Sequence, residues 1–396
     1  MARDLRPMSY DFALILAARL LRAFGFGMAT VLVGLHLERR GLGAGAIGLV
    51  LTIGLLSAAI AGVIAATLSS RIGRRFTLAG AGLLMAIAGL DLALANSPLL
   101  LGVAAATGML GAASVDLGPF ASIEQAALAE SVEPRRRNLA FARYSLTGGL
   151  AAAAGGLLAG TATDLNRGRL LFAVYALIGV MTAVLALLLS PRAEAPVRTA
   201  ALSSAQIRAL APLSALFAID ALGGGLVVNA VIAYWLHVRF GAPASVLGPA
   251  FAAIALLQAA SYEASGRLAN RIGLIRTMVF THIPSNILLL LVPLSPSLPW
   301  AIGLLLARFS LSQMDVPARQ AFVVSIVPPA ERAGAVAFTG LVRGLGQAGG
   351  PLLSGAAIQS AALGLPFYLA GGLKLVYDVS LFAGFRSRRA EHETVH

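Results

Sequence analysis

Twelve long apolar runs, separated by short polar segments, make up most of this 396-residue chain. Most runs reach the roughly 20 residues that an α-helix needs to cross the hydrocarbon core of a bilayer. Several contain Gly or Pro, which membrane helices tolerate better than soluble ones. The pattern predicts an all-α integral membrane protein with twelve transmembrane helices, over residues 11–36, 45–68, 77–95, 99–128, 139–161, 170–189, 208–235, 245–266, 275–294, 298–324, 334–357 and 363–385.

The second half of this pattern repeats the first. Residues 70–73 (Ser-Arg-Ile-Gly) return 200 positions later as residues 270–273 (Asn-Arg-Ile-Gly), and each copy lies between two apolar runs. Two related halves are typical of transporters built from internal repeats. We therefore expect two pseudo-symmetric six-helix halves and a central linker, with the boundaries 1–189 for the first half, 190–207 for a cytoplasmic linker, 208–385 for the second half and 386–396 for a cytoplasmic tail.

The distribution of arginine predicts the orientation. Of the 30 basic residues, all but Lys374 are arginine, and with a cytoplasmic N-terminus 18 arginines fall in cytoplasmic segments against 5 on the other side. The positive-inside rule therefore favours cytoplasmic N- and C-termini, and we expect a multi-pass protein of the cell (inner) membrane. The arginines of these loops explain the net charge of +13, so we expect no nucleic-acid partner. The expected partners are the lipid bilayer and a small solute, and the protein is expected to be a monomer.

Composition also excludes several classes of protein. The mean hydropathy is +0.84, and only 12% of residues are charged. The chain has no cysteine, its five histidines lack the spacing of metal ligands, and no phosphate-binding Gly-x-x-x-x-Gly-Lys-Ser/Thr loop is present. We expect no enzyme activity, no cofactor and no metal. A sensor that does not transport is a remote alternative, because no appended soluble domain is available for signalling.

At the loop between the second and third runs, the chain resembles the major facilitator superfamily. The family pattern, Asp-Arg-x-Gly-Arg-Arg/Lys, reads Ser-Arg-Ile-Gly-Arg-Arg here, with Asn-Arg-Ile-Gly as the second copy. The resemblance implies the fold of that superfamily and secondary transport by alternating access. It also implies that the two loops act as gates, through Ser70, Arg71, Gly73, Asn270, Arg271 and Gly273. Because Ser and Asn replace the loop aspartate, we expect the latch between the halves to be weaker, or to be carried by Glu263 and Arg267 instead.

A second family pattern, Gly-x-x-x-Gly-Pro-x-x-Gly-Gly, belongs to proton-coupled exporters, where it lies in the fifth helix. Here its best version lies in the eleventh run, with Gly346, Gly350-Pro351 and Ser354-Gly355. Small residues at this spacing also let helices approach closely and bend. The motif therefore favours export slightly, with plain helix packing as the alternative.

Charged residues inside the runs are concentrated in four of them. A charge in the hydrocarbon core costs about 3 kcal/mol on insertion scales, so each needs a reason. Runs 1, 4, 7 and 10 hold nine of the fifteen, and in the family these helices line the central cavity. The candidates for proton coupling are Asp116, Asp220 and Asp315, and those for substrate binding are Arg19, Arg22, Glu124, Arg308, Arg319, Gln313 and Asn229.

Spacing suggests partners for some of these charges. Arg308, Asp315 and Arg319 share one face of a continuous tenth helix, which Pro317 is expected to bend. The repeat places Glu124 opposite Arg319, either as a pair that binds a zwitterion or as a structural ion pair.

The remaining charges leave alternatives open. Asp116 and Asp220 have no nearby arginine on their own helices, which suits a proton carrier, although a structural hydrogen bond is the alternative. Arg19 and Arg22 share a face, and bind an anion or pair with one of these acids. Lys374 and Asp378, four positions apart, predict an ion pair within the twelfth helix.

The sequence thus predicts a secondary active transporter of a small organic solute, with a preference for an amphiphilic or zwitterionic one. Proton-coupled efflux by antiport is the first expectation, and proton-coupled uptake by symport is the alternative.

Overall fold

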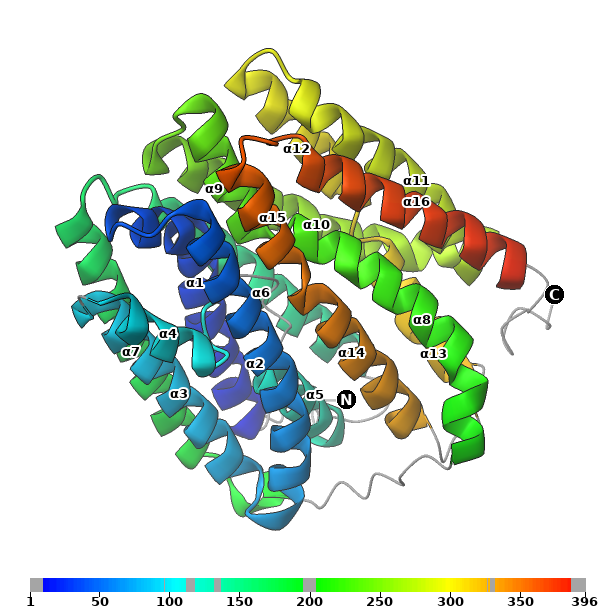
Figure 1. Cartoon of the computed structure of the whole chain (residues 1–396). Helices are drawn as coiled ribbons and strands as arrows, with labels where there is room; N and C mark the ends of the chain where they lie inside the picture. The colour runs from blue at the N-terminus through cyan, green and yellow to red at the C-terminus, as the bar shows by residue number, and fades with distance from the viewer. Residues whose placement is uncertain are drawn as a thin grey trace, which may run out of the picture. The chain divides into compact units, whose positions relative to one another are not determined.

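A computed structural model describes residues 10–95, 97–111, 118–131, 137–194, 204–325, 327 and 332–385. Within these residues every regular element is helical (Figure 1). The α-helices are α1 (Tyr10–Arg39), α2 (Ala44–Arg71), α3 (Arg74–Leu94), α4 (Pro98–Ala106), α5 (Pro119–Ser131), α6 (Arg137–Ala159), α7 (Leu165–Leu187), α8 (Ser204–Leu226), α9 (Asn229–Phe240), α10 (Ala244–Ile272), α11 (Leu274–Leu291), α12 (Leu298–Leu311), α13 (Asp315–Ser325), α14 (Arg332–Ala348), α15 (Gly350–Gln359) and α16 (Leu365–Phe385), with short 3₁₀ turns η2 (Pro191–Glu194) and η3 (Val292–Leu294).

Eight segments of the described chain are long and apolar enough to cross a membrane. They coincide with eight of the twelve predicted runs, and the other four runs fall on α4 with α5, on α6, on α12 with α13, and on α14 with α15. Four of the runs are interrupted in the structure. Those over 99–128, 208–235, 298–324 and 334–357 each contain two helices.

Local chemistry explains these breaks. After α4, Gly108 and Gly111 have φ of +72° and +65°, a conformation that L-residues with a side chain rarely adopt. Between α14 and α15, Pro351 lacks the N–H that would continue the helix. Between α8 and α9, the free carbonyl of Leu226 accepts a hydrogen bond of 2.6 Å from the Ser354 hydroxyl, so the exposed backbone is satisfied inside the protein.

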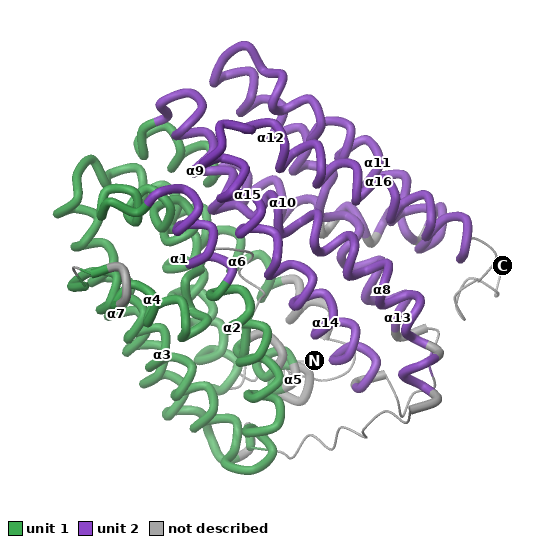
Figure 2. The backbone as a smooth tube through the Cα atoms, in the orientation of Figure 1, with its two compact units in different colours: residues 1–42, 53–198, 243–252 green, residues 43–52, 199–242, 253–396 purple. Residues whose placement is uncertain are grey.

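The described chain forms two compact units (Figure 2). Unit 1 comprises residues 1–42, 53–198 and 243–252, and unit 2 comprises 43–52, 199–242 and 253–396. The units therefore do not follow two consecutive blocks of sequence. The first residues of α2 belong to unit 2 and those of α10 belong to unit 1.

In unit 1, α3 packs along α7, and α1 packs against α6 and α7. Small residues allow the close approach: a Cβ added to Gly82 would lie 2.7 Å from the Ala183 nitrogen, and one added to Gly179 would lie 2.8 Å from the Ala86 Cα. Such contacts are typical of membrane helices, which gain stability from dispersion contacts rather than from the hydrophobic effect.

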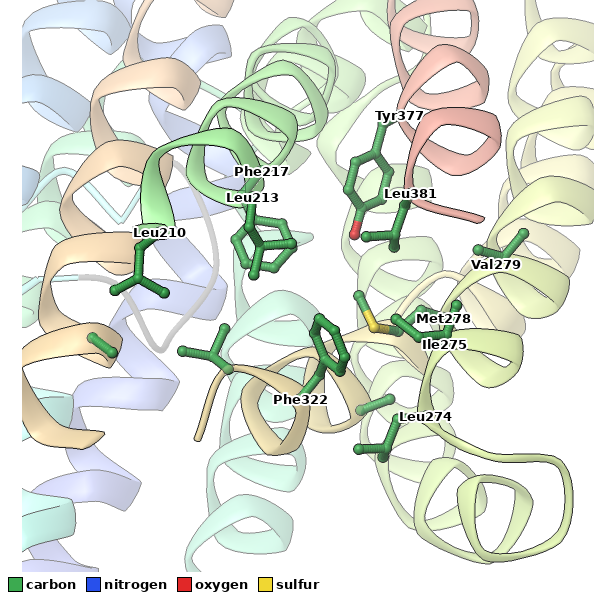
Figure 3. Close-up of a cluster of buried hydrophobic side chains, with 13 residues drawn as sticks. Leu210, Leu213, Phe217, Leu274, Ile275, Met278, Val279, Phe322, Tyr377 and Leu381 are labelled. Carbon is green, nitrogen blue, oxygen red and sulfur yellow. The ribbon is translucent and has the colours of Figure 1, made fainter. Parts of the chain in front are cut away.

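In unit 2, α8 packs against α14 and α16, and α11 packs against α16, α12 and α13. A buried apolar cluster fills this unit near the beginning of α8 and the end of α16 (Figure 3). Its labelled members come from α8, α11, α13 and α16: Leu210, Leu213, Phe217, Leu274, Ile275, Met278, Val279, Phe322, Tyr377 and Leu381.

The loops before α3 and α11 share one geometry, as the internal repeat predicts. Gly73 has φ +93° and Gly273 has φ +88°, a region open to glycine. Each glycine carbonyl accepts a hydrogen bond from a threonine four residues on, Thr77 at 2.7 Å and Thr277 at 2.8 Å. The repeat at 200 positions is therefore a repeat of backbone conformation and not only of sequence.

Candidate functional site

In unit 1, the charged side chains centre on Glu124 of α5. Both carboxylate oxygens accept hydrogen bonds from Arg22 of α1, at 2.6 and 2.7 Å, and one also accepts from the Tyr144 hydroxyl of α6 at 2.7 Å. The side chains of Arg22 and Glu124 are 0% and 2% exposed. The Arg22 guanidinium also lies 4.1 Å from the ring centre of Phe120. Both Nη atoms of Arg22 and both carboxylate oxygens of Glu124 therefore have hydrogen-bond partners.

The other sequence candidates of unit 1 surround this pair or lie outside the described chain. Arg19 is buried, and its guanidinium lies 4.4 Å from the centre of the Tyr144 ring. The sequence predicted that Arg19 and Arg22 bind an anion or pair with Asp116 or Asp220. Arg22 does pair with an acid, but this acid is Glu124. Asp116, the first candidate for proton coupling, lies outside the described residues.

In unit 2, Asp220 of α8 is surrounded by cations. Lys374 of α16 donates to its carboxylate at 2.7 Å and Arg343 of α14 at 2.9 Å, while Arg319 of α13 lies at 3.8 Å and His282 of α11 at 3.7 Å. Asp220 has no nearby arginine on its own helix, which is the only helix that the sequence prediction considered. Its partners come from other helices, which spacing along a single helix does not reveal.

His282 links Asp220 to a second buried acid. Its Nδ1 lies 2.8 Å from a carboxylate oxygen of Asp378, whose other oxygen accepts a hydrogen bond of 2.9 Å from Asn286. The predicted ion pair between Lys374 and Asp378 was wrong, because Lys374 reaches Asp220 and Asp378 bonds to α11. Sequence reasoning missed His282 and Asn286, although two polar residues four positions apart in an apolar run were a usable signal.

The tenth run brings its candidates together differently from the prediction. The run is not one helix with a single polar face, because residues 312–314 interrupt it. Pro317 lies in the first turn of α13, where proline is tolerated. Asp315 and Arg319 pair at 2.5 Å across one turn of α13, as their spacing suggested. Arg308, near the end of α12, is 6% exposed.

The two uncharged candidates lie at helix breaks. Gln313 is part of the interruption between α12 and α13, and Asn229 is the first residue of α9, directly after the break that follows α8. Breaks of this kind bring polar backbone groups into the interior of a membrane protein. This placement keeps both residues as candidates for contact with a solute.

Each unit also contains an ion pair between the first and the fourth apolar run of its half of the sequence. The positive and negative partners are exchanged between the two units. Arg22 of α1 pairs with Glu124 of α5 in unit 1, and Asp220 of α8 lies 3.8 Å from Arg319 of α13 in unit 2. Glu124 and Arg319, which the repeat aligns, thus each find an opposite charge within their own unit.

The predicted gating residues lie at the two repeat loops. Ser70 is exposed, and its hydroxyl donates to the Thr67 carbonyl of its own helix at 2.7 Å. The carboxylate at this loop comes from Glu194, which accepts hydrogen bonds from the Arg74 and Arg75 backbone N–H groups at 2.6 and 3.2 Å. Arg71 and Arg271 are exposed, and the side chains of Asn270 and Glu263 lie outside the described part of the structure.

Comparison with known proteins decides the family. The family model of the Major Facilitator Superfamily matches residues 15–307 and 213–395. The chain belongs to this superfamily. An uncharacterized membrane protein of Saccharomyces cerevisiae is 26% identical over 95% of this chain and 94% of its own length.

Solved structures share the fold at low identity. The nucleoside transporter NupG aligns with a TM-score of 0.78 and 13% identity, over 94% of this chain and 99% of NupG. A D-xylose–proton symporter aligns with a TM-score of 0.73 and 16% identity, over 94% of this chain and 97% of the symporter. Family and fold together indicate a multi-pass membrane transporter of small solutes rather than an enzyme.

Proposed function

We propose that this superfamily member is a proton-coupled secondary transporter, and that its coupling site is the Asp220–His282–Asp378 chain of unit 2. The observation that carries the proposal is the position of His282 between two buried carboxylates, at 3.7 and 2.8 Å. Histidine changes charge more readily near neutral pH than other side chains. A proton taken up here therefore changes the charge of a site that lies in the core of the unit.

His282 contacts Asp220 and Asp378, and the other charged side chains of the cluster surround Asp220 and its partners. Besides the two carboxylates and Asn286 on its own helix, the cluster contains Arg308 on α12, Asp315 and Arg319 on α13, Arg343 on α14, and Lys374 on α16. Because opposite charges at this distance are strongly coupled in a buried site, a proton on His282 redistributes the contacts of Asp220. That redistribution is the step by which proton binding alters the affinity for solute.

Different observations favour the two directions of transport. Export by antiport is supported by the small-residue motif around Pro351, although that motif also packs helices closely, since a Cβ on Gly346 would lie 2.7 Å from the Ala218 carbonyl oxygen. Uptake by symport is supported by the cationic surroundings of Asp220, because protonation adds positive charge and favours the simultaneous binding of an anion. The relative named as a proton symporter is 16% identical and supports only the fold.

The experiment has two stages, of which the first does not depend on protons. Everted vesicles with and without the protein are incubated with a mixture of cellular small molecules, and mass spectrometry identifies the solute that moves only when the protein is present. Its flux is then measured with a pH-sensitive dye for wild type, His282→Gln and the matched control His237→Gln. His237 lies on α9 and contacts a backbone carbonyl, that of Ala242, at 2.8 Å.

We expect solute-dependent proton movement in wild type and His237→Gln, and its loss in His282→Gln. Proton movement unchanged by His282→Gln would refute the coupling site. Absence of any solute flux that depends on the protein would refute transport. The sign of the dye response gives the direction, because antiport and symport move protons oppositely for the same solute gradient.

A further inference from the structure

Arg308 is a buried cation that the described protein does not neutralise. The residue is 6% exposed, and its Nε and Nη1 atoms are buried without a hydrogen-bond partner. Within the described residues it forms no ion pair, and Asp220 is the charged group that acts on it electrostatically. A buried guanidinium with unmet donors is costly, so Arg308 in this position does not stabilise the fold.

The surrounding cluster has one positive charge in excess. Arg308, Arg319, Arg343 and Lys374 face three carboxylates, those of Asp220, Asp315 and Asp378, when His282 is neutral. Three of these cations lie against a carboxylate: Arg319 at 2.5 Å from Asp315, and Lys374 and Arg343 at 2.7 and 2.9 Å from Asp220. Among the described residues, Arg308 is therefore the cation of this cluster that has no carboxylate within ion-pair distance.

Local features of the protein compensate this charge only in part. Arg308 lies in the last turn of α12, whose C-terminal carbonyls favour a cation, and its guanidinium lies 4.6 Å from the neighbouring Phe309 ring. Neither feature provides acceptors for the two buried N–H groups. One turn later, the Ser312 hydroxyl is also buried without a hydrogen-bond partner, and it can donate to an anion bound on the same face of the helix.

We infer that Arg308, with Ser312, binds the carboxylate group of a small organic anion, and that this anion is the transported solute. A carboxylate carries the single negative charge that the cluster lacks, and arginine donates to it by charge-assisted hydrogen bonds. The identification of the anion as cargo rests on the proposed transport function, whereas the binding site does not.

Proton coupling follows from the same charge count. When His282 is protonated, the cluster gains a second excess positive charge, so the anion binds more tightly. Proton and anion then bind together, which is the condition for symport and not for exchange.

The test is equilibrium binding to the purified protein in a chloride-free buffer, followed by thermal unfolding. The probes are benzoate, its neutral analogue benzamide, its cationic analogue benzylamine and inorganic phosphate, with sodium methanesulfonate as the control for ionic strength. The variants are Arg308→Gln and the control Arg239→Gln, which removes an exposed arginine on α9. Measurements are made at about pH 7.5 and about pH 5.5, on either side of the usual histidine range.

We expect benzoate alone among the three aromatic probes to stabilise wild type and Arg239→Gln, with binding about 10- to 100-fold weaker in Arg308→Gln, the loss expected for a hydrogen bond to a buried charge. Benzoate binding should strengthen at the lower pH in wild type and not in His282→Gln. Without probe, Arg308→Gln should unfold at the same temperature as wild type or a higher one, because it removes an unpaired buried charge.

Three results would overturn the inference. The first is that benzoate stabilises Arg308→Gln as much as it stabilises the wild type. The second is that benzoate stabilises the wild type no more than methanesulfonate does. The third is that phosphate binds more tightly than benzoate. Failure of the transport proposal is separate: benzoate binding through Arg308 without any solute flux supports the site and refutes transport. Proton-coupled flux of a cation that is unaffected by Arg308→Gln supports transport and refutes the anion as its cargo.

Discussion

Removal of one partner of the Arg22–Glu124 pair is expected to destabilise unit 1, because the other charge is then left buried without its partner. Glu124→Gln removes the charge that both Nη atoms of Arg22 contact at 2.6 and 2.7 Å, and leaves a guanidinium that is 0% exposed. Breaking a buried pair in this way costs about 3–5 kcal/mol, or roughly a 100- to 4000-fold change in the unfolding equilibrium at about 1.4 kcal/mol per factor of ten. Tyr144→Phe, which removes one hydrogen bond to the carboxylate, should cost about 1.5–3 kcal/mol.

The composition of the chain determines the assay. Both tryptophans, Trp235 and Trp300, lie in unit 2, so tryptophan fluorescence does not report on unit 1. Because the chain has no cysteine, a single Ala88→Cys on α3, where the alanine is 0% exposed, makes thiol labelling a local probe of opening. Ala233→Cys, also at a residue that is 0% exposed, serves as the matched probe in unit 2.

In this assay Glu124→Gln should shift labelling of the unit 1 cysteine to lower denaturant concentrations. The double variant Arg22→Met with Glu124→Leu should restore most of the stability, because replacing a whole buried ion pair with apolar side chains is often nearly neutral. The reasoning is refuted if Glu124→Gln labels no faster than its parent. It is also refuted if the double variant is as unstable as the sum of its two single variants, since that would mean that the two side chains are not coupled.

Two further predictions concern packing and capping in unit 1. Gly82→Val should destabilise the unit by about 1–3 kcal/mol, because its Cβ would lie 2.7 Å from the Ala183 nitrogen. The control Gly80→Val, whose Cβ would have no atom within 4 Å, should leave the unfolding midpoint unchanged. Equal effects of the two substitutions would contradict the packing argument. Glu194→Ala should destabilise the unit by about 1 kcal/mol, because it removes the side chain that caps α3. Hydrogen exchange at the Arg74 amide, which donates to Glu194 at 2.6 Å in the wild type, should become faster. Unchanged exchange would show that the cap does not hold this turn.

The sequence was sufficient to predict which segments are helical, but not where helices break. The twelve apolar runs correspond to described helices because apolar length alone is a strong signal in a membrane protein. The breaks in runs 4 and 11 coincide with glycine and proline residues of the runs themselves, whereas the break in run 7 depends on a distant partner. The break after Leu226 is satisfied by Ser354, which lies 128 positions away, and nothing in the local sequence indicates that partner.

Charge partners were harder to predict than charge positions. Sequence reasoning identified Asp220, Lys374 and Asp378 as buried charges that need partners, and all three are buried. It paired the latter two along one helix because four-residue spacing is the only proximity visible in sequence. In the structure their partners lie on neighbouring helices. Which residues become partners depends on how α8, α11 and α16 are rotated about their axes. Pairs within one short turn, such as Asp315 and Arg319, were predictable for the same reason.

The exchanged signs in the two repeats explain how related units acquire different chemistry. The Coulomb energy of a pair depends on the product of its charges, so exchanging an Arg–Glu pair for an Asp–Arg pair between the same two repeat segments preserves the attraction. The surroundings need not stay equal. In unit 1 the carboxylate of Glu124 is enclosed by Arg22 and Tyr144, whereas in unit 2 the acid lies on the first repeat segment and is open to further cations from α14 and α16. Among the described residues, unit 2 has both a histidine beside the acid and an arginine without a carboxylate partner. Under the proposed function, the charge of unit 2 responds to a proton and to an anion, whereas that of the enclosed pair does not.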